Sequence, residues 1–230
     1  MTPDEKQKAW EEFQVRQRAA QAIYDSFRYT EAQRERLLDF IGAAMKVIRG
    51  DAPFEMLSRL VPIKRQEPAI VSGQAYRGGT EFTFNACFLN QWTSLYMLGT
   101  TDEQGKVEPY HFQIELGPSM RIERDRLEKL LQLKVVPGWT AEGGNLRPPG
   151  FVILRDGSFH EVNDSTFAYD VLDAPVAPYE VKVEFNYLHG PTGDPRTAVQ
   201  LSRLEIRRDY RTPTQLRKRE ADRPSPTSIH

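Results

Sequence analysis

Three histidines are the residues of this sequence that could most readily transfer protons or bind a metal ion. They are His111, His160 and His189, and Asp194 follows the last of them by five residues. Zinc motifs place two ligands close together on a helix or a tight turn. His160 alone has a strong ligand directly beside it, Glu161, but adjacent residues of a strand face opposite ways. The spacing therefore predicts no metal site and no other cofactor.

The residues that could act as nucleophiles lack the context of a catalytic motif. Ser119, in the run Gly117-Pro118-Ser119-Met120, lacks the second glycine of G-x-S-x-G and is instead typical of a loop or a helix cap. Cys87 is the single cysteine, which excludes an intramolecular disulfide. Its place on a predicted strand with alternating phenylalanines favours a structural role. Because no catalytic motif is present, the sequence favours a protein that is not an enzyme.

The loop from His189 to Pro195 contains two glycines and two prolines. Loops held by a rigid hairpin often carry function, so His189 and Asp194 are candidate partner-binding residues. An alternative is a hydrolase or lyase with an unrecognised site near this pair. That alternative requires the two side chains to converge in one pocket with another histidine or a buried carboxylate.

Basic residues gather near the end of the chain, although the formal net charge of the whole is only −1. Between Arg203 and Arg223, eight basic residues stand against four acidic ones. They could bind a protein partner, and a second alternative is a nucleic-acid-binding β-domain that uses this basic C-terminal segment. The lack of overall positive charge weighs against nucleic acid. The basic candidates are Arg207, Arg208, Arg211, Lys218 and Arg219.

An aromatic-rich stripe marks the first predicted helix, which begins at a capping box formed by Thr2 and Glu5. The spacing of the stripe predicts a core face. Any part of it left uncovered would be an apolar patch for a partner or a second copy, so Trp10 and Phe13 are also candidate partner-binding residues. The stripe consists of Trp10, Phe13, Ala20, Ile23, Tyr24 and Phe27.

Two further helices are predicted before residue 62. A second capping box at Thr30 and Gln33 starts a helix with an apolar face that ends at Gly50. We expect this helix to form an antiparallel pair with the first. A short third helix follows Pro53 and stops at Pro62.

From Ala69 onward, short alternating runs separated by glycine and proline predict a β-rich region. The clearest element is a hairpin over residues 179–210, whose second arm changes phase and so indicates a bulge near Ser202-Arg203. One amphipathic helix is predicted between Glu123 and Leu133. The expected strands span 69–76, 80–89, 94–100, 107–116, 150–154, 158–163, 167–172 and the two arms of the hairpin.

These patterns predict an α+β protein. An N-terminal helical segment of two to three helices packs with an antiparallel β-sandwich or a bent sheet that carries one inserted helix. We expect a helical segment at 1–62, an antiparallel β-rich domain at 69–210 and a flexible basic and polar tail at 211–230. No apolar run approaches the length of a membrane span and no leader is evident, so we expect a cytoplasmic protein.

The function that we expect is that of a non-enzymatic intracellular binding or assembly protein, of the accessory, adaptor, structural or inhibitor type. It would act through a β-sheet face or edge together with the N-terminal helices. A protein partner or self-association fits this hypothesis, because apolar and aromatic residues lie on long helices and strands while the charged tail suits a macromolecular partner.

Overall fold

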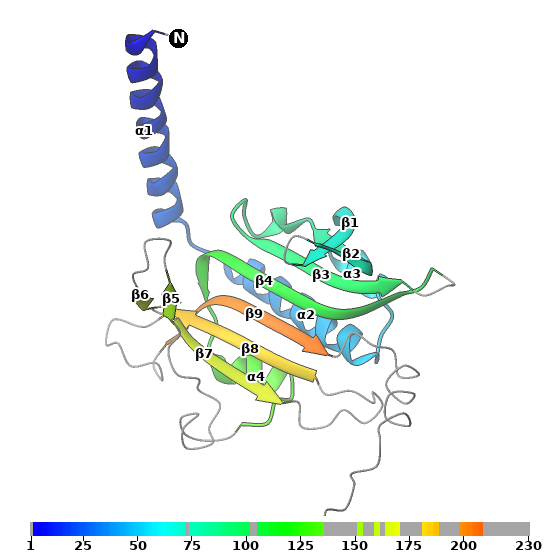
Figure 1. Cartoon of the computed structure of the whole chain (residues 1–230). Coiled ribbons are helices and arrows are strands. Elements are labelled where there is room, and N and C mark those ends of the chain that lie inside the picture. Colours follow the sequence, from blue (N-terminus) through cyan, green and yellow to red (C-terminus); the bar gives the residue numbers. More distant parts are fainter. Residues whose placement is uncertain are drawn as a thin grey trace, which may run out of the picture.

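The computed structural model of this protein describes residues 2–71, 74–101, 105–135, 151–153, 159–161, 164–170, 181–188 and 198–208. The α+β class is confirmed in these residues (Figure 1). The helices are α1 (Pro3–Ser26), α2 (Glu31–Arg49), α3 (Glu55–Leu60) and α4 (Arg124–Leu130), with a short 3₁₀ helix, η1 (Ala86–Phe88).

The strands of the described residues form two antiparallel sheets. The larger sheet has seven strands in the order β1-β2-β3-β4-β9-β8-β7, and β5 and β6 form the smaller one. The strands are β1 (Ile63–Val71), β2 (Gln74–Phe84), β3 (Ser94–Thr101), β4 (Val107–Arg121), β5 (Phe151–Ile153), β6 (Phe159–Glu161), β7 (Asp164–Asp170), β8 (Val181–Leu188) and β9 (Gln200–Arg208).

Both long helices begin at the expected capping boxes. The hydroxyl of Thr2 accepts a hydrogen bond from the Glu5 backbone at 3.3 Å, and the Glu5 carboxylate accepts one from the Thr2 backbone at 2.6 Å. Thr30 and Gln33 form the same reciprocal pair. The second helix ends at Gly50, whose φ of 81° is a left-handed conformation that glycine adopts without strain.

The hairpin expected over 179–210 is formed by β8 and β9. Asn186 pairs with Arg203 and Tyr187 with Leu201, so Ser202 is the extra residue of a bulge. The predicted bulge is therefore confirmed, and it explains why the apolar phase of the second arm shifts by one residue.

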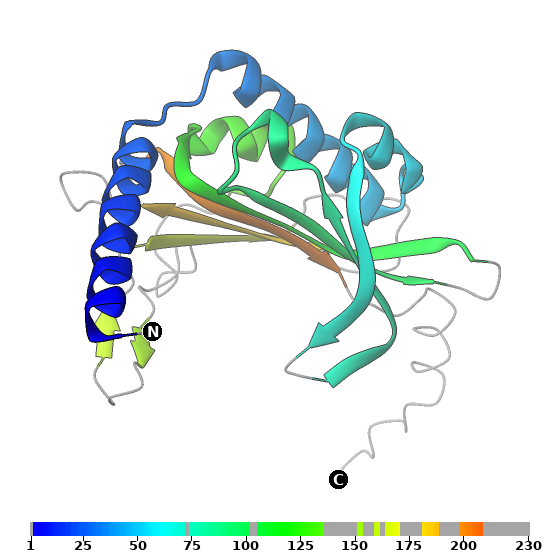
Figure 2. The ribbon, with the colours of Figure 1, turned by 90° about the horizontal axis from the view of Figure 1, so that it is seen from above.

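The core lies between one face of the large sheet and the layer formed by α2, α3 and α4 (Figure 2). Nine residues of α2 are buried in it. Opposite them, a row of buried residues crosses five neighbouring strands from β3 to β7 in register. That row is Met97, Phe112, Ile206, Val183 and Tyr169.

The arrangement of the first two helices differs from the sequence-based prediction. Instead of pairing with α2, α1 projects away from the sheet (Figure 1). The prediction failed because both helices carry an apolar stripe. The sequence alone therefore does not show which of the two stripes packs on the sheet. Near residue 27 the chain leaves α1 and turns onto the core, so α2 is the helix that packs there.

Two smaller predictions are also corrected. The expected strand 69–76 is the end of β1 and the start of β2, since β1 already begins at Ile63 and pairs with β2. Cys87 is exposed and lies in η1 rather than on a strand, because the Asn85 side chain accepts a hydrogen bond from the Cys87 backbone and caps the turn. The sequence left either a β-sandwich or a bent sheet as the expected arrangement. The seven strands of the large sheet form a single open sheet.

No helix of the described residues is long and apolar enough to cross a membrane.

Candidate functional site at the exposed helix and its root

Apolar side chains of α1 stand in solvent. The exposed fraction is 54% for Trp10, 44% for Phe13, 64% for Val15 and 58% for Ile23. The rings of Trp10 and Phe13 stack on each other with their centroids 5.6 Å apart. An exposed pair of stacked rings is typical of a contact surface for another molecule.

A seam with the alternating three- and four-residue spacing of a coiled coil runs along α1 and includes every residue of the stripe except Ile23. Gln17 is its polar member, at the middle of the helix. Val15 lies on the other side of the helix, about 200° around the axis from Phe13. The seam positions are Trp10, Phe13, Gln17, Ala20, Tyr24 and Phe27.

The C-terminal end of the stripe is anchored to the large sheet with α2, α3 and α4, which together we call the body. The anchoring rings, which we call the root cluster, are those of Tyr24, Phe27, Tyr29 and Trp92. The ring of Trp92 lies 5.3 Å from that of Tyr24 and 5.9 Å from that of Phe27, both edge-on. The rings of Phe27 and Tyr29 are 4.9 Å apart. All four side chains remain partly exposed, so another molecule could still pack on the cluster.

Glycine is required beneath the root cluster. A Cβ atom on Gly117 would approach the carbonyl oxygen of Trp92 to 2.9 Å, closer than real Cβ contacts. This close approach of β4 holds Trp92 under the helix. The direction in which α1 leaves the body therefore depends on backbone packing as well as on side chains.

Tyr29 fixes the connection between α1 and α2. Its hydroxyl donates to the Pro118 carbonyl at 2.9 Å, lies 3.0 Å from the Thr93 hydroxyl and accepts from the Asn90 amide at 2.7 Å. Burial raises the pKa of Tyr29, so its hydroxyl stays protonated at neutral pH. Three polar partners from two segments thus hold the base of α1 in place.

A pocket of about 450 Å³ opens beside the root cluster, and we call it the basic pocket. Arg34 pairs with Glu31, and the Nε atom of Arg121 lies 3.4 Å from Glu123. Arg28 donates hydrogen bonds to two backbone carbonyls. Positive charge beside aromatic surface suits the acidic residues of a partner. The lining residues are Phe27, Arg28, Tyr29, Arg34, Pro118, Ser119, Arg121 and Gln200.

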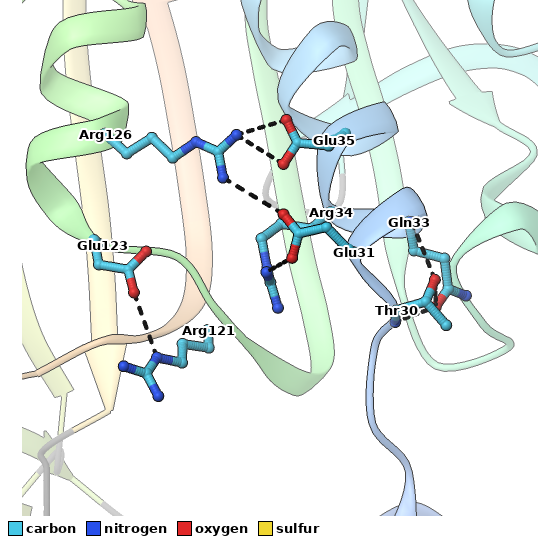
Figure 3. Close-up of polar contacts among 8 residues, drawn as sticks. All are labelled: Thr30, Glu31, Gln33, Arg34, Glu35, Arg121, Glu123 and Arg126. Atoms are coloured by element: carbon cyan, nitrogen blue, oxygen red, sulfur yellow. Dashed lines mark hydrogen bonds and ion pairs between the residues drawn. The ribbon is translucent and has the colours of Figure 1, made fainter.

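An ion-pair network next to the basic pocket joins α4 to the first turn of α2 (Figure 3). The Nη2 atom of Arg126 donates to both carboxylate oxygens of Glu35, at 2.7 and 2.5 Å, and Nη1 lies 3.9 Å from Glu31. These hydrogen bonds lower the pKa of Glu35 and raise the pKa of Arg126. The wall of the pocket is therefore held by charges from two helices.

The sheet face opposite the helices, which we call the polar face, is the second candidate site. Consecutive strands place Tyr96, Gln113, Glu205 and Glu184 side by side as cross-strand partners. Because the strands alternate, this row lies on the other side of the sheet from the core. In Figure 1, α2 lies behind the sheet and the polar face is toward the viewer.

Glu205 is the centre of the polar face and is only 8% exposed. One carboxylate oxygen lies 3.1 Å from His111 Nε2 and 3.3 Å from an Arg207 nitrogen, and the other accepts from Arg203 at 3.0 Å. The contact with His111 is the main cause that lowers the pKa of Glu205, and the arginine charges add to it, while burial acts in the opposite direction. Arg203 also donates to Gln113 at 2.8 Å.

Tyr96 extends this network toward β3. Burial, with a further contribution from Glu115, raises the pKa of Tyr96 to about 12. Its ring meets that of His111 edge-on at 5.9 Å. A histidine beside a carboxylate can pass a proton, but two arginines also hold this carboxylate in place. The polar face can therefore recognise polar groups, while a nucleophile with a dedicated base is not seen in the described residues.

The structure separates the residues that the sequence singled out. Trp10 and Phe13 are exposed on α1, and Arg207 lies on the polar face. Arg208 has a side chain only 5% exposed; it donates to the Pro109 carbonyl at 2.8 Å and lines a separate pocket of about 340 Å³. The remaining candidates lie outside the described residues, so their roles stay predictions. They are His189, Asp194, Arg211, Lys218 and Arg219.

The sequence reasoning missed the root cluster and the polar face. Tyr29, Trp92 and Gly117 meet only through the fold, and no local pattern links them. The polar face had a signal in the sequence, because Arg203, Glu205 and Arg207 alternate on one strand.

Within the described ranges, no three His, Cys, Asp or Glu side chains lie together as metal ligands would. No protein-family model, curated protein or solved structure matches this chain.

Proposed function

We propose that this chain is a binding or assembly protein that engages a protein partner through α1. The observation that supports the proposal most is the exposure of Trp10 and Phe13 on a helix that is capped at one end and anchored at the other. Burial of apolar surface is worth about 25 cal/mol per Å², so a partner that covers these rings gains binding free energy.

The core does not need the exposed part of α1. Nine residues of α2 already cover the sheet, and the ordered contacts of α1 with the body lie at the root cluster. A helix that is held at one end presents anchor residues at helical spacing along the rest of its length. This is the arrangement by which amphipathic helices bind apolar grooves or other helices.

The arginines of β9 give less support to the nucleic-acid alternative. Arg203 and Arg207 contact Glu205, and Arg208 contacts Glu108 at 3.8 Å and a backbone carbonyl. Arginines whose charges are matched in this way stabilise the sheet more than they attract phosphates.

Site-specific photo-cross-linking in the source cells tests the proposal. The photo-reactive amino acid p-benzoylphenylalanine replaces Phe13 in one variant and Val15 in a control variant. Both residues are apolar and exposed on the same helix, but only Phe13 belongs to the stripe. We expect a discrete cross-linked product from position 13 that is absent from position 15. No product at position 13, or the same products from both positions, would contradict the proposed function.

A further inference from the structure

We propose that the basic pocket is a binding site for a small organic phosphate. Arg28, Arg34 and Arg121 hold the phosphate group, and the organic part of the ligand lies against Phe27 and Tyr29. This site goes beyond the contact that we propose for α1 and does not depend on it.

The charge of the pocket comes from three separate segments of the chain. Arg28 lies in the connection between α1 and α2, Arg34 in the first turn of α2 and Arg121 at the end of β4. The side chains of the last two are drawn in Figure 3. No acidic residue is among the described residues that line the pocket. The wall that these residues form is therefore positively charged and suits an anion.

Arg34 has a hydrogen-bond donor that lacks an acceptor. One end of its guanidinium group pairs with Glu31, but the Nε atom is buried and has no hydrogen-bond partner in the described part of the chain. A buried donor without a partner costs free energy, so such groups normally contact a protein atom, a water or a ligand. An oxygen of a bound anion is an acceptor of the kind that this donor lacks.

The other two arginines can turn toward a ligand at little cost. Arg28 donates to the backbone carbonyls of Asp25 and Phe27, which are neutral groups, at 2.7 Å each. Arg121 lies 3.4 Å from Glu123, and the two side chains are 66% and 50% exposed. Exposed ion pairs of this kind are weak. A doubly charged ligand can therefore compete with the present partners of both arginines.

The geometry favours a phosphate over a single carboxylate. A carboxylate has two oxygens in one plane, and one guanidinium group can satisfy both in a bidentate contact. A phosphate monoester presents three terminal oxygens and carries a charge of about −1.5 to −2 at pH 7. Three guanidinium groups from three segments therefore match a phosphate group, whereas they offer a lone carboxylate more donors than it can use.

The pocket has room for more than the phosphate group. Its volume of about 450 Å³ lies within the range of about 300–1,000 Å³ that is typical of pockets for small organic molecules. Phe27 and Tyr29 line it with rings that stand edge-on, with their centroids 4.9 Å apart. Because the Tyr29 hydroxyl donates to the Pro118 carbonyl at 2.9 Å, its ring is held in place before a ligand binds. An aromatic group attached to the phosphate fits this wall.

Isothermal titration calorimetry of the full chain with phenyl phosphate tests the proposal, because this probe combines a phosphate group with an aromatic ring. We expect a Kd below about 1 mM. Benzoate, which has the ring but a single carboxylate, should bind at least about tenfold more weakly. Inorganic phosphate should bind more weakly than phenyl phosphate because it lacks the ring. No binding of phenyl phosphate at about 10 mM, or equal binding of benzoate, would overturn the proposal.

Substitutions inside and outside the pocket locate the site. Arg28→Gln and Arg121→Gln each remove one charge from the pocket and should weaken the binding of phenyl phosphate at least about fivefold. Arg65→Gln is the matched control, because Arg65 is also an exposed strand arginine that pairs with the glutamate two residues later, at 3.5 Å. Its affinity should equal that of the wild type. Unchanged affinity in both pocket variants, or the same loss in the control, would show that the probe does not bind in the pocket.

A steric variant tests the pocket without changing its charge. Ser119 lines the pocket and is partly exposed, so Ser119→Phe fills part of the volume. We expect this variant to lose the binding of phenyl phosphate. Circular dichroism and thermal melting check that every variant is folded, and the arginine variants decide the question if Ser119→Phe is not. A folded Ser119→Phe protein that binds like the wild type would contradict the proposed site.

A peptide of four glutamates separates a small phosphate from the acidic residues of a protein partner. We expect this peptide to bind at least about tenfold more weakly than phenyl phosphate. If it binds as tightly and is weakened by the same arginine substitutions, the pocket serves a protein partner and the small-molecule ligand is wrong. None of these measurements bears on the cross-link at position 13, so the two proposals can fail separately.

Discussion

At the scale of single residues, Glu205 is the group on which the polar face depends. Its carboxylate contacts His111, Arg203 and Arg207 from two neighbouring strands, and its side chain is 10% exposed. A buried carboxylate is tolerated because these partners replace water. Removing its charge therefore leaves Arg203 and Arg207, which flank Glu205 on β9, without the carboxylate that they share.

We expect Glu205→Gln to lower the free energy of unfolding by about 2 kcal/mol at pH 7, because the charged partners lose their acceptor. The pKa of Glu205 is lowered in the folded state, so its stabilising contribution is present above its unfolded pKa of about 4.3 and is lost as the pH falls through the folded value. The difference between wild type and variant should therefore shrink below about pH 4. Urea unfolding at pH 7 and pH 3 measures it.

Glu184→Gln is the matched control for this prediction. Glu184 contacts Arg207 on the same face but is 29% exposed. Its replacement should cost less than about 1 kcal/mol, as for a partly exposed ion pair. Equal effects of the two variants, or a Glu205 effect that does not change with pH, would show that the carboxylate of Glu205 does not hold the network.

At the scale of elements, α1 and α2 have the same kind of cap and the same kind of stripe, but different roles. The α2 residues Leu37 and Ile41 are fully buried, whereas Trp10 and Phe13 of α1 are exposed. Stability of the body should therefore depend on α2 and hardly at all on the first part of α1.

Deletion of residues 1–22 should change the free energy of unfolding by less than about 1 kcal/mol, because the root cluster stays in place and little buried surface is lost. The substitution Ile41→Ala in α2 should cost about 2–5 kcal/mol. Chemical unfolding of the purified proteins compares the two. A large effect of the deletion would mean that α1 belongs to the core.

At the scale of the whole molecule, the core and the exposed part of α1 are separate regions. The sheet with α2, α3 and α4 buries the core (Figure 2), whereas α1 projects away from the sheet beyond the root cluster (Figure 1). An isolated helix in water is only marginally stable. A partner that covers α1 would therefore stabilise this helix without changing the packing of the core.

Hydrogen exchange should show this difference within one molecule. We expect the backbone amides of residues 5–20 to exchange at least about tenfold faster than those of α2, because α2 is buried against the sheet and this part of α1 is exposed. The double variant Trp10→Ser with Phe13→Ser should leave the exchange of α2 unchanged, because both side chains lie outside the core. Mass spectrometry of peptides from the two helices measures both rates in the same sample. Equal protection of the two helices would contradict the prediction.

Much of the fold could be predicted because its signals are local. The reciprocal contacts of Thr2 with Glu5 and of Thr30 with Gln33 span three residues, and the shift of phase around Ser202 is visible within one strand. The candidate sites are different. The root cluster joins Tyr24 to Trp92, and the polar face joins Gln113 to Glu205, so each contact spans more than 60 residues of chain.

The sequence by itself determined where the two long helices begin, that the strands are antiparallel and where the last hairpin carries a bulge. These features depend on hydrogen bonds and side-chain alternation among near neighbours. The tertiary structure alone decided that the stripe of α2 is buried and that of Trp10 and Phe13 is exposed. Burial depends on what lies opposite a face, and two similar amphipathic helices competed for one side of the sheet.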